Sequence, residues 1–375
     1  MKRNVLVLGA AALVLIGCII AAGCVSDNTA GQTKIYDFEH HYIVPEFFDY
    51  LKDRTDYPLL TSDGILYREN CLLTIFCPSI GKNSNASTYE ELTDLGALRL
   101  SILDNAGIST AMVSSGQGIE ELSKEDAVRL AQITNNRVAE AVKKYPGRFL
   151  GTITLPTPYV EESITELERA VNELGLQYWH THSNYNGEYL YEEKFEPIFA
   201  KCAELNVPFY IHPNYPCDDY LTNGGVLVSG AVFGFGVDVM KTSLLLTLNG
   251  VFDRYPNLQM IIGHMAEFYP YTIDRMDNRL RCSDAYASEL KCNKTLAEYF
   301  ANKNIFMTTS GIYDPAVVTC AIETIGIDNI LFATDYPYED VKGEVEFIKS
   351  LPISNEDKDK IFYKNAEKYI IKDRS

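Results

Sequence analysis

All six histidines of this chain lie at or near the carboxyl ends of short apolar segments with the pattern of buried β-strands. They are His40, His41, His180, His182, His212 and His264. Random placement would rarely produce this pattern in 375 residues. Active sites of α/β barrels lie at the carboxyl ends of their parallel strands. The histidines therefore predict a polar site at one end of a parallel sheet.

The segments that carry the histidines belong to a regular alternation of apolar runs and helical patterns. We predict eight strands, at 35–41, 109–115, 149–156, 176–182, 208–213, 258–264, 305–311 and 330–337. Helical periodicity occupies 91–106, 124–145, 161–174, 192–205, 237–255, 314–325 and 339–351, and a final helix at 355–369 would close the bottom of the fold. Such alternation indicates βα units. The length suits one (β/α)8 TIM barrel of ~250 residues with insertions.

Two loops after the predicted strands are much longer than the others. Residues 42–89 follow the first strand, and residues 214–236 follow the fifth. Both leave the carboxyl ends of strands, so we predict that they form a cap over the pocket. The second loop contains a glycine-rich apolar stretch at 224–230. This stretch suits a mobile lid, a contact between subunits, or both.

Four side chains stand where a barrel would bring metal ligands together. Glu39 and His41 are two residues apart on the first strand and point to the same side, whereas His40 should face the surrounding helices. His212 lies at the end of the fifth strand and Asp335 in the eighth. Burying these groups without a shared partner would cost several kcal/mol, so we predict one divalent ion. Two imidazoles and two carboxylates suit Zn2+ or Mn2+ and leave a coordination position open.

The charge of the chain restricts its partners. With 33 basic and 51 acidic residues, the formal net charge is -18. Such a surface repels phosphate backbones and anionic headgroups, so we exclude nucleic-acid binding. A carboxylate ligand must then be held by local cations or by the metal. The nine cysteines form no CxxC pair, and we expect free thiols rather than a disulfide framework, with pairing of Cys71 with Cys77 or of Cys282 with Cys292 as an alternative outside the cytoplasm.

The amino terminus has the pattern of a secretory leader. Lys2 and Arg3 precede an apolar run at 5–22, followed by a lipoprotein-type box that ends at Cys24. We predict a lipoprotein signal peptide at 1–24, a tether at 25–34 and a barrel domain at 35–375. The protein would be extracytoplasmic and held at the membrane by its lipid. Cys18 is a rival lipidation site, and an uncleaved anchor is an alternative.

Four motifs in chain order carry a family resemblance. They are Phe-Glu-His-His-Tyr-Ile-Val-Pro-Glu at 38–46, Pro-Phe-Tyr-Ile-His-Pro at 208–213, Ile-Ile-Gly-His-Met-Ala-Glu at 261–267 and Ile-Leu-Phe-Ala-Thr-Asp-Tyr-Pro at 330–337. With them the chain resembles the amidohydrolase-2 family, or aminocarboxymuconate-semialdehyde decarboxylase-like family, of the amidohydrolase superfamily. The first motif, with Glu-x-His in place of His-x-His, resembles the dihydroxybenzoate and resorcylate decarboxylase branch.

The resemblance implies roles for several residues. It assigns Glu39, His41, His212 and Asp335 to the metal, and Asp335, His264 and Glu267 to catalysis. The absence of a bridging lysine on the fourth strand implies a single ion, and the family implies a homodimer. His180 and His182 are candidate substrate contacts, with a hydrogen-bonded structural role as the alternative. Arg275 is a candidate carboxylate anchor, although a helix salt bridge is the simpler interpretation.

Two reactions fit this set of groups. The resemblance favours decarboxylation of a small hydroxylated aromatic or related carboxylic acid. The alternative is hydrolysis of a lactone, ester or amide by metal-bound water. A third hypothesis is a binding lipoprotein without catalysis, which the complete set of metal and acid–base residues disfavours.

Overall fold

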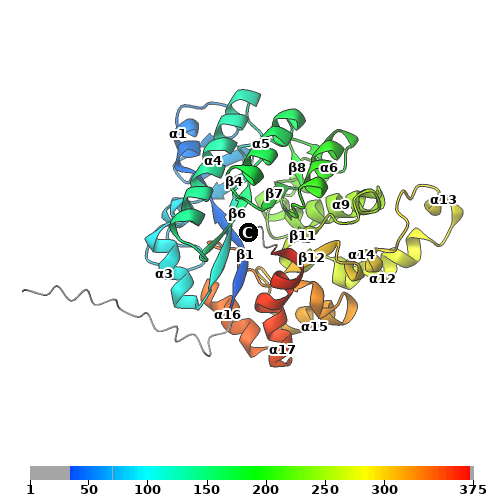
Figure 1. The fold of residues 1–375 in the computed structure, drawn as a ribbon. Helices are drawn as coiled ribbons and strands as arrows, with labels where there is room; N and C mark the ends of the chain where they lie inside the picture. Colours follow the sequence, from blue (N-terminus) through cyan, green and yellow to red (C-terminus); the bar gives the residue numbers. More distant parts are fainter. Residues whose placement is uncertain (1–33, 70, 372–375) are drawn as a thin grey trace, which may run out of the picture. The chain divides into compact units, whose positions relative to one another are not determined.

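Eight parallel strands form one sheet whose order follows the chain. The computed structural model describes residues 34–69 and 71–371. In sheet order the strands are β1 (Tyr36–Tyr42), β5 (Thr110–Ser115), β6 (Phe149–Ile153), β7 (Tyr178–His182), β10 (Phe209–His212), β11 (Met260–Ile262), β12 (Ile305–Thr308) and β13 (Ile330–Leu331). Each pairs in parallel with the next. Figure 1 shows helices surrounding these strands, as the predicted barrel requires.

The barrel closes between β1 and the segment that follows β13. The Phe38 amide donates to the Phe332 carbonyl at 3.0 Å, and the His41 amide donates to the Tyr336 carbonyl at 2.8 Å. In return, the Tyr336 amide donates to the Glu39 carbonyl at 3.1 Å. These bonds confirm the (β/α)8 TIM barrel and bring the first and last strands together.

The helices between the strands lie close to their predicted positions. They are α3 (Ala97–Ala106), α4 (Lys124–Lys144), α5 (Val160–Asn172), α6 (Glu196–Glu204), α9 (Gly234–Leu248), α15 (Pro315–Thr324) and α16 (Val341–Ser350). The longest, α4, buries one stripe that includes Ala127, Leu130, Thr134, Val138 and Ala141. This spacing of three to four residues is the pattern of a helix covering a sheet.

Some element boundaries differ from the prediction. The helix predicted at 91–106 is divided into α2 (Thr88–Thr93) and α3, because the chain is extended at Asp94. The helix predicted at 237–255 is also divided into two, α9 and α10 (Val251–Arg254). The break lies at Gly250, which adopts a φ of 75°. The helices between β11 and β12 were not among the predicted helical segments; they are α11 (Gly263–Ala266), α12 (Tyr269–Leu280), α13 (Asp284–Ala287) and α14 (Leu296–Ala301).

The two long loops contain short elements of their own. The first holds α1 (Pro45–Leu51) and an antiparallel sheet of β2 (Leu59–Leu60), β3 (Gly64–Arg68) and β4 (Cys71–Thr74). The second holds α7 (Asp219–Thr222) and α8 (Val226–Ser229). Side chains from both loops line the cavity at the end of the barrel, as predicted for a cap.

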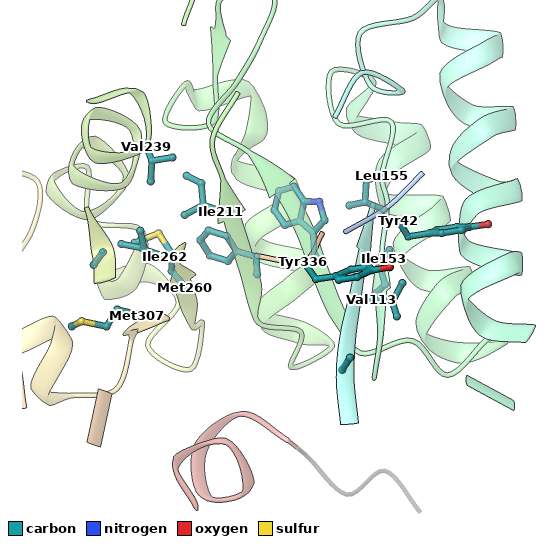
Figure 2. Packing of buried hydrophobic residues seen from close by; sticks show 14 of the residues in the cluster. Tyr42, Val113, Ile153, Leu155, Ile211, Val239, Met260, Ile262, Met307 and Tyr336 are labelled. Atoms are coloured by element: carbon teal, nitrogen blue, oxygen red, sulfur yellow. The ribbon is translucent and has the colours of Figure 1, made fainter. Parts of the chain in front are cut away.

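Two apolar clusters hold the barrel together. The larger lies between strands and helices, where Ile211 of β10 and Ile262 of β11 pack near Val239 of α9 (Figure 2). The smaller cluster contains Phe38, Met112, Tyr178, Tyr210, Ile261, Phe306, Leu331, Ala333, Ala366 and Ile370. Ala366 and Ile370 come from the carboxyl-terminal helical segment, beyond α17 (Asn355–Asp359). This segment therefore packs on the smaller cluster, in agreement with the helix that was predicted to close the bottom of the fold.

The predicted leader at 1–24 and most of the tether lie outside the described residues. Among the helices within 34–371, none has the length and apolar character needed to cross a bilayer. The seven cysteines of this part of the chain are free thiols, as predicted.

Candidate metal centre and catalytic pocket

The structure brings the four predicted metal ligands together at one end of the barrel. One ligand atom each from Glu39, His41, His212 and Asp335 lies within 4.8 Å of the others. The Nε2 atom of His41 is 3.0 Å from Asp335 Oδ1 and 3.8 Å from Glu39 Oε1. The Nε2 atom of His212 is 3.6 Å from Glu39 Oε1. Residues from the two ends of the barrel sequence thus converge because β1 lies beside the segment after β13.

The chemistry of these groups fits a divalent ion. Neither buried carboxylate oxygen of Glu39 makes a hydrogen bond of normal geometry. Burial and the nearby Asp335 carboxylate raise the pKa of Glu39, so the two acidic groups need a cation between them. His212 Nδ1 lies 2.8 Å from the Pro213 carbonyl and donates to it, which leaves Nε2 free as a ligand. Two nitrogen and two oxygen donors suit Zn2+ or Mn2+.

Left-handed backbone turns place the acidic and imidazole groups that follow β11 and β13. Asp335 has a φ of 59°, and His264 has a φ of 48°. The turn after β11 continues through Met265, Ala266 and Glu267, all at positive φ. Such conformations cost L-residues roughly 1–2 kcal/mol each and are concentrated at functional sites. The predicted strand ends at His264 and Asp335 are therefore turns that aim side chains across the barrel mouth.

His264 forms a pair with Glu267 beside the metal ligands. Its Nδ1 atom is 3.0 Å from Glu267 Oε1, and its Nε2 atom is 3.7 Å from Asp335 Oδ2. Burial disfavours the imidazolium form, but the charges of Glu39 and Glu267 outweigh it and raise the pKa of His264 well above its usual value. Asp335 responds in the opposite direction, because contacts with His264 and His41 outweigh burial and lower its pKa. The pair has the arrangement of a proton donor held by a carboxylate.

A cavity of about 690 Å³ opens onto these groups. His41, His212, His264, Glu267 and Asp335 form its polar end. Its other walls come from the two cap loops and from the segments after β12 and β13. The size falls within the range of ~300–1,000 Å³ that is typical of small-molecule sites.

The three candidate substrate contacts do not line the cavity, but two of them lie beside a metal ligand, since the rings of His180 and His182 are 5.5 and 5.6 Å from the His212 ring. His180 and His182 are buried on β7 and are not among the residues that line the cavity. His182 Nδ1 lies 3.1 Å from Glu120 Oε1, and the roles of His180 and His182 as substrate contacts stay predictions. His180 stacks on Tyr210 at 5.5 Å, and burial lowers its pKa well below the usual value. Arg275 is exposed on α12, away from the cavity lining, and its role as an anchor stays a prediction.

Several polar residues that support the site were not predicted. Asp37 accepts hydrogen bonds from the Thr334 amide at 3.0 Å and hydroxyl at 2.6 Å, and also lies 2.8 Å from His40 Nε2. His40 therefore faces away from the metal, as expected, and stacks on Tyr336. Arg99 donates to the His41 carbonyl at 2.7 Å. The contacts of Asp37 with Thr334 and of Arg99 with His41 span distant segments, so no local pattern in the sequence could reveal them.

An eight-stranded barrel with a single-ion donor set at the carboxyl ends of its strands defines a metal-dependent TIM-barrel enzyme. A model of the family described as Amidohydrolase matches residues 103–369. The chain belongs to this amidohydrolase family, as the four motifs predicted.

Relatives of the chain include several decarboxylases. It is 33% identical over 291 residues to gamma-resorcylate decarboxylase from Polaromonas sp. strain JS666, covering 74% of this chain and 87% of the relative. A crystal structure of 5-carboxyvanillate decarboxylase from Novosphingobium aromaticivorans with bound manganese is similar, with a TM-score of 0.77 and 31% identity over 90% of this chain and 96% of that one. The 2,6-dihydroxybenzoate decarboxylase from Rhizobium gives a TM-score of 0.73 at 26% identity, covering 90% and 98% of the two chains.

Proposed function

We propose that this protein is a metal-dependent decarboxylase that acts on a hydroxylated aromatic acid. The observation that carries the proposal is that three of the four converging metal ligands and the His264–Glu267 pair line one cavity. The relatives named as resorcylate, dihydroxybenzoate and carboxyvanillate decarboxylases support this reaction type. Zn2+ or Mn2+ is the expected ion, and manganese is bound in the carboxyvanillate enzyme.

The reaction replaces a carboxylate by a proton. When bound by Glu39, His41, His212 and Asp335, a divalent ion would hold the substrate carboxylate and hydroxyl and offset the negative charge that develops. The His264 imidazolium donates its proton to the ring carbon that bears the carboxylate. The bond from that carbon to the carboxylate then breaks, and CO2 leaves. Glu267 keeps the imidazole oriented and favours its protonated form until the proton is transferred.

Product analysis separates decarboxylation from hydrolysis. Metal-loaded protein is assayed for CO2 release from a panel of hydroxybenzoates and for opening of lactones, esters and amides. The proposal expects CO2 and the decarboxylated phenol in equal amounts. If lactones or esters are opened while no hydroxybenzoate yields CO2, the hydrolase alternative replaces it. Binding of these acids without any turnover would instead favour the non-catalytic lipoprotein.

We further propose that the leader at 1–24 directs the enzyme out of the cytoplasm and that a lipid on Cys24 holds it at the membrane through the tether at 25–34. The basic start, the apolar run and the cysteine box support this proposal. A Cys24→Ala variant should leave the membrane fraction, whereas a Cys18→Ala variant should remain there. If Cys24→Ala stays in the membrane, Cys18 or an uncleaved leader is the anchor.

We also propose that the enzyme is a homodimer. A shallow, mostly apolar hollow on α9 is lined by Val237, Met240, Lys241, Leu244, Leu245 and Phe268. Apolar patches of this kind usually mark interfaces. Sedimentation of the full chain in detergent should give a dimer, and Met240→Glu with Leu244→Glu should shift it to a monomer. If the full chain and the double variant both sediment as monomers, the dimer is excluded.

A further inference from the structure

The cavity has two ends of opposite character. His41, His212, Asp335 and the His264–Glu267 pair form the polar end. At the other end, the cap loops supply apolar and aromatic side chains, including Tyr67, Leu73, Tyr215, Val226, Leu227 and Val232. Leu227 and Val232 are 72% and 79% exposed, so large apolar side chains stand open at the mouth. This end would bind an apolar group, because covering these side chains removes apolar surface from water.

The charges along the wall are uneven. Among the described residues that line the cavity, none is a lysine or an arginine. With an ion bound, the carboxylates of Glu39 and Asp335 are neutralised, and Glu267 is paired with the His264 imidazolium. Glu339 lies on the wall without such a partner. Burial raises the pKa of Glu339, while Tyr313 opposes the rise.

Glu339 lines the cavity but is not one of the four residues whose ligand atoms converge. It is four residues beyond Asp335, and its carboxylate group lies over Gly311, where a Cβ would be 3.8 Å from Oε1. Its neighbour Asp340 is also acidic and adds to the negative potential. A second carboxylate on a substrate would meet this potential without a cation to pair with.

We infer that the cavity selects hydroxyaromatic acids with a single carboxylate and an uncharged apolar substituent opposite it, and that Glu339 excludes substrates with a second carboxylate. This inference rests on the proposed decarboxylase function. It separates this enzyme from the related 5-carboxyvanillate decarboxylase, whose substrate by name carries two carboxylates. Glu339 is thus a specificity residue, and the apolar cap is the binding site of the substituent.

Three substrates test the inference in the metal-loaded full chain. They are 2,6-dihydroxybenzoate, its 4-hexyl derivative and 5-carboxyvanillate. The catalytic efficiency, kcat/KM, should be at least tenfold higher for the hexyl derivative than for the parent acid. For the dicarboxylate 5-carboxyvanillate it should be at least tenfold lower than for the parent acid. Equal values for the hexyl and parent acids would overturn the apolar site. Efficient turnover of the dicarboxylate would overturn the exclusion.

Matched variants locate the effect. Glu339→Gln should improve the catalytic efficiency towards the dicarboxylate, relative to that towards 2,6-dihydroxybenzoate, at least fivefold. Glu346→Gln removes an exposed carboxylate from α16 and should leave this ratio unchanged. Leu227→Gln changes an exposed side chain. It should reduce the ratio of kcat/KM for the 4-hexyl derivative to that for the parent acid several-fold. If Glu339→Gln leaves the ratio where it was, Glu339 does not set charge selectivity.

Binding separates failure of the inference from failure of the proposed reaction. Titration calorimetry with 2-nitroresorcinol and its 5-hexyl derivative measures the cavity without turnover. At least tenfold tighter binding of the hexyl compound supports the apolar site even if no acid yields CO2, in which case only the reaction is wrong. Equal affinities overturn the apolar site whatever the reaction.

Discussion

His264 Nδ1 lies 3.0 Å from Glu267 Oε1, and the two residues are joined by a turn in which all four residues have positive φ. In a regular right-handed helix, residues three apart can also meet, but their backbone would not aim the imidazole across the barrel mouth. The left-handed turn lets His264 reach towards Asp335 while Glu267 holds its other nitrogen. The proton donor is thus built from one short segment beside the metal ligands.

Glu267→Gln should weaken the proton donor. Loss of the carboxylate lowers the pKa of His264, because a charge that favours the imidazolium is removed. Activity that needs protonated His264 is lost as pH rises through that pKa, so the alkaline limb of the kcat profile should move to lower pH. The maximal kcat should fall by about 10² or more. Asp274→Asn, an exposed change on α12, is the control, and an unmoved alkaline limb in Glu267→Gln would contradict the pairing.

Asp335→Asn should abolish both metal binding and turnover. The substitution removes a charged ligand that comes from the far end of the chain and leaves Glu39 and two histidines. Elemental analysis should show less than one tenth of the metal found in the parent protein, and CO2 release should be undetectable. A variant that keeps its metal and its activity would show that the four-ligand site is misassigned.

Removing the metal should also lower thermal stability. An ion that binds only the folded barrel stabilises it by RT ln(1 + [L]/Kd), which is about 4 kcal/mol at a thousandfold excess over Kd. Dialysis against a chelator should therefore lower the Tm, and Mn2+ or Zn2+ should restore it. In Asp335→Asn the chelator should cause little change. If the chelator lowers the Tm of the parent protein and of Asp335→Asn by the same amount, the stabilising ion binds at another site.

Arg99→Lys should destabilise the barrel. The buried guanidinium donates to the carbonyls of His41 at 2.7 Å and Glu91 at 3.0 Å and lies 4.7 Å from the Tyr336 ring. A lysine cannot make these contacts together, and it leaves buried acceptors without donors. We expect a loss of about 3 kcal/mol in the free energy of unfolding by urea. Arg129→Lys changes an exposed ion pair on α4 and should lose less than about 1 kcal/mol. Equal losses would contradict the role of Arg99.

The parts of the fold that follow a local period could be predicted from the sequence. Strand alternation placed Glu39 and His41 on one side and His40 on the other, and the structure has this arrangement. The eight strands and most helices were located for the same reason. Because parallel strands end at one face, the predicted strand ends also brought His212 and Asp335 into the same site.

The remaining features depend on contacts between distant segments or on unusual backbone. Nothing local distinguishes Arg99 from other basic residues of a helix, and its burial follows from how α3 meets β1. The pairing of His182 with Glu120 joins a strand to a separate loop. The left-handed conformation at His264 and Asp335 has no glycine to mark it. The predicted strands 258–264 and 330–337 were therefore too long.

Glu344 on α16 should make stability fall as pH rises. Burial and the nearby Glu339 carboxylate raise its pKa to about 9, so the folded protein holds it protonated at neutral pH. A group whose pKa is raised by folding stabilises fully below its unfolded value and loses that contribution as pH rises through the folded value. Its stabilising contribution should therefore decrease between about pH 4.5 and pH 9.

Glu344→Gln keeps a neutral group of similar shape and should remove this pH dependence. The difference in Tm between Glu344→Gln and the parent protein should then be more positive at pH 8.5 than at pH 5.5, values that lie roughly at the two ends of the window set by the pKa shift. Glu346→Gln, two residues along the same helix and exposed, should show no such trend. A parallel response of the two variants would mean that Glu344 is ionised in the folded protein.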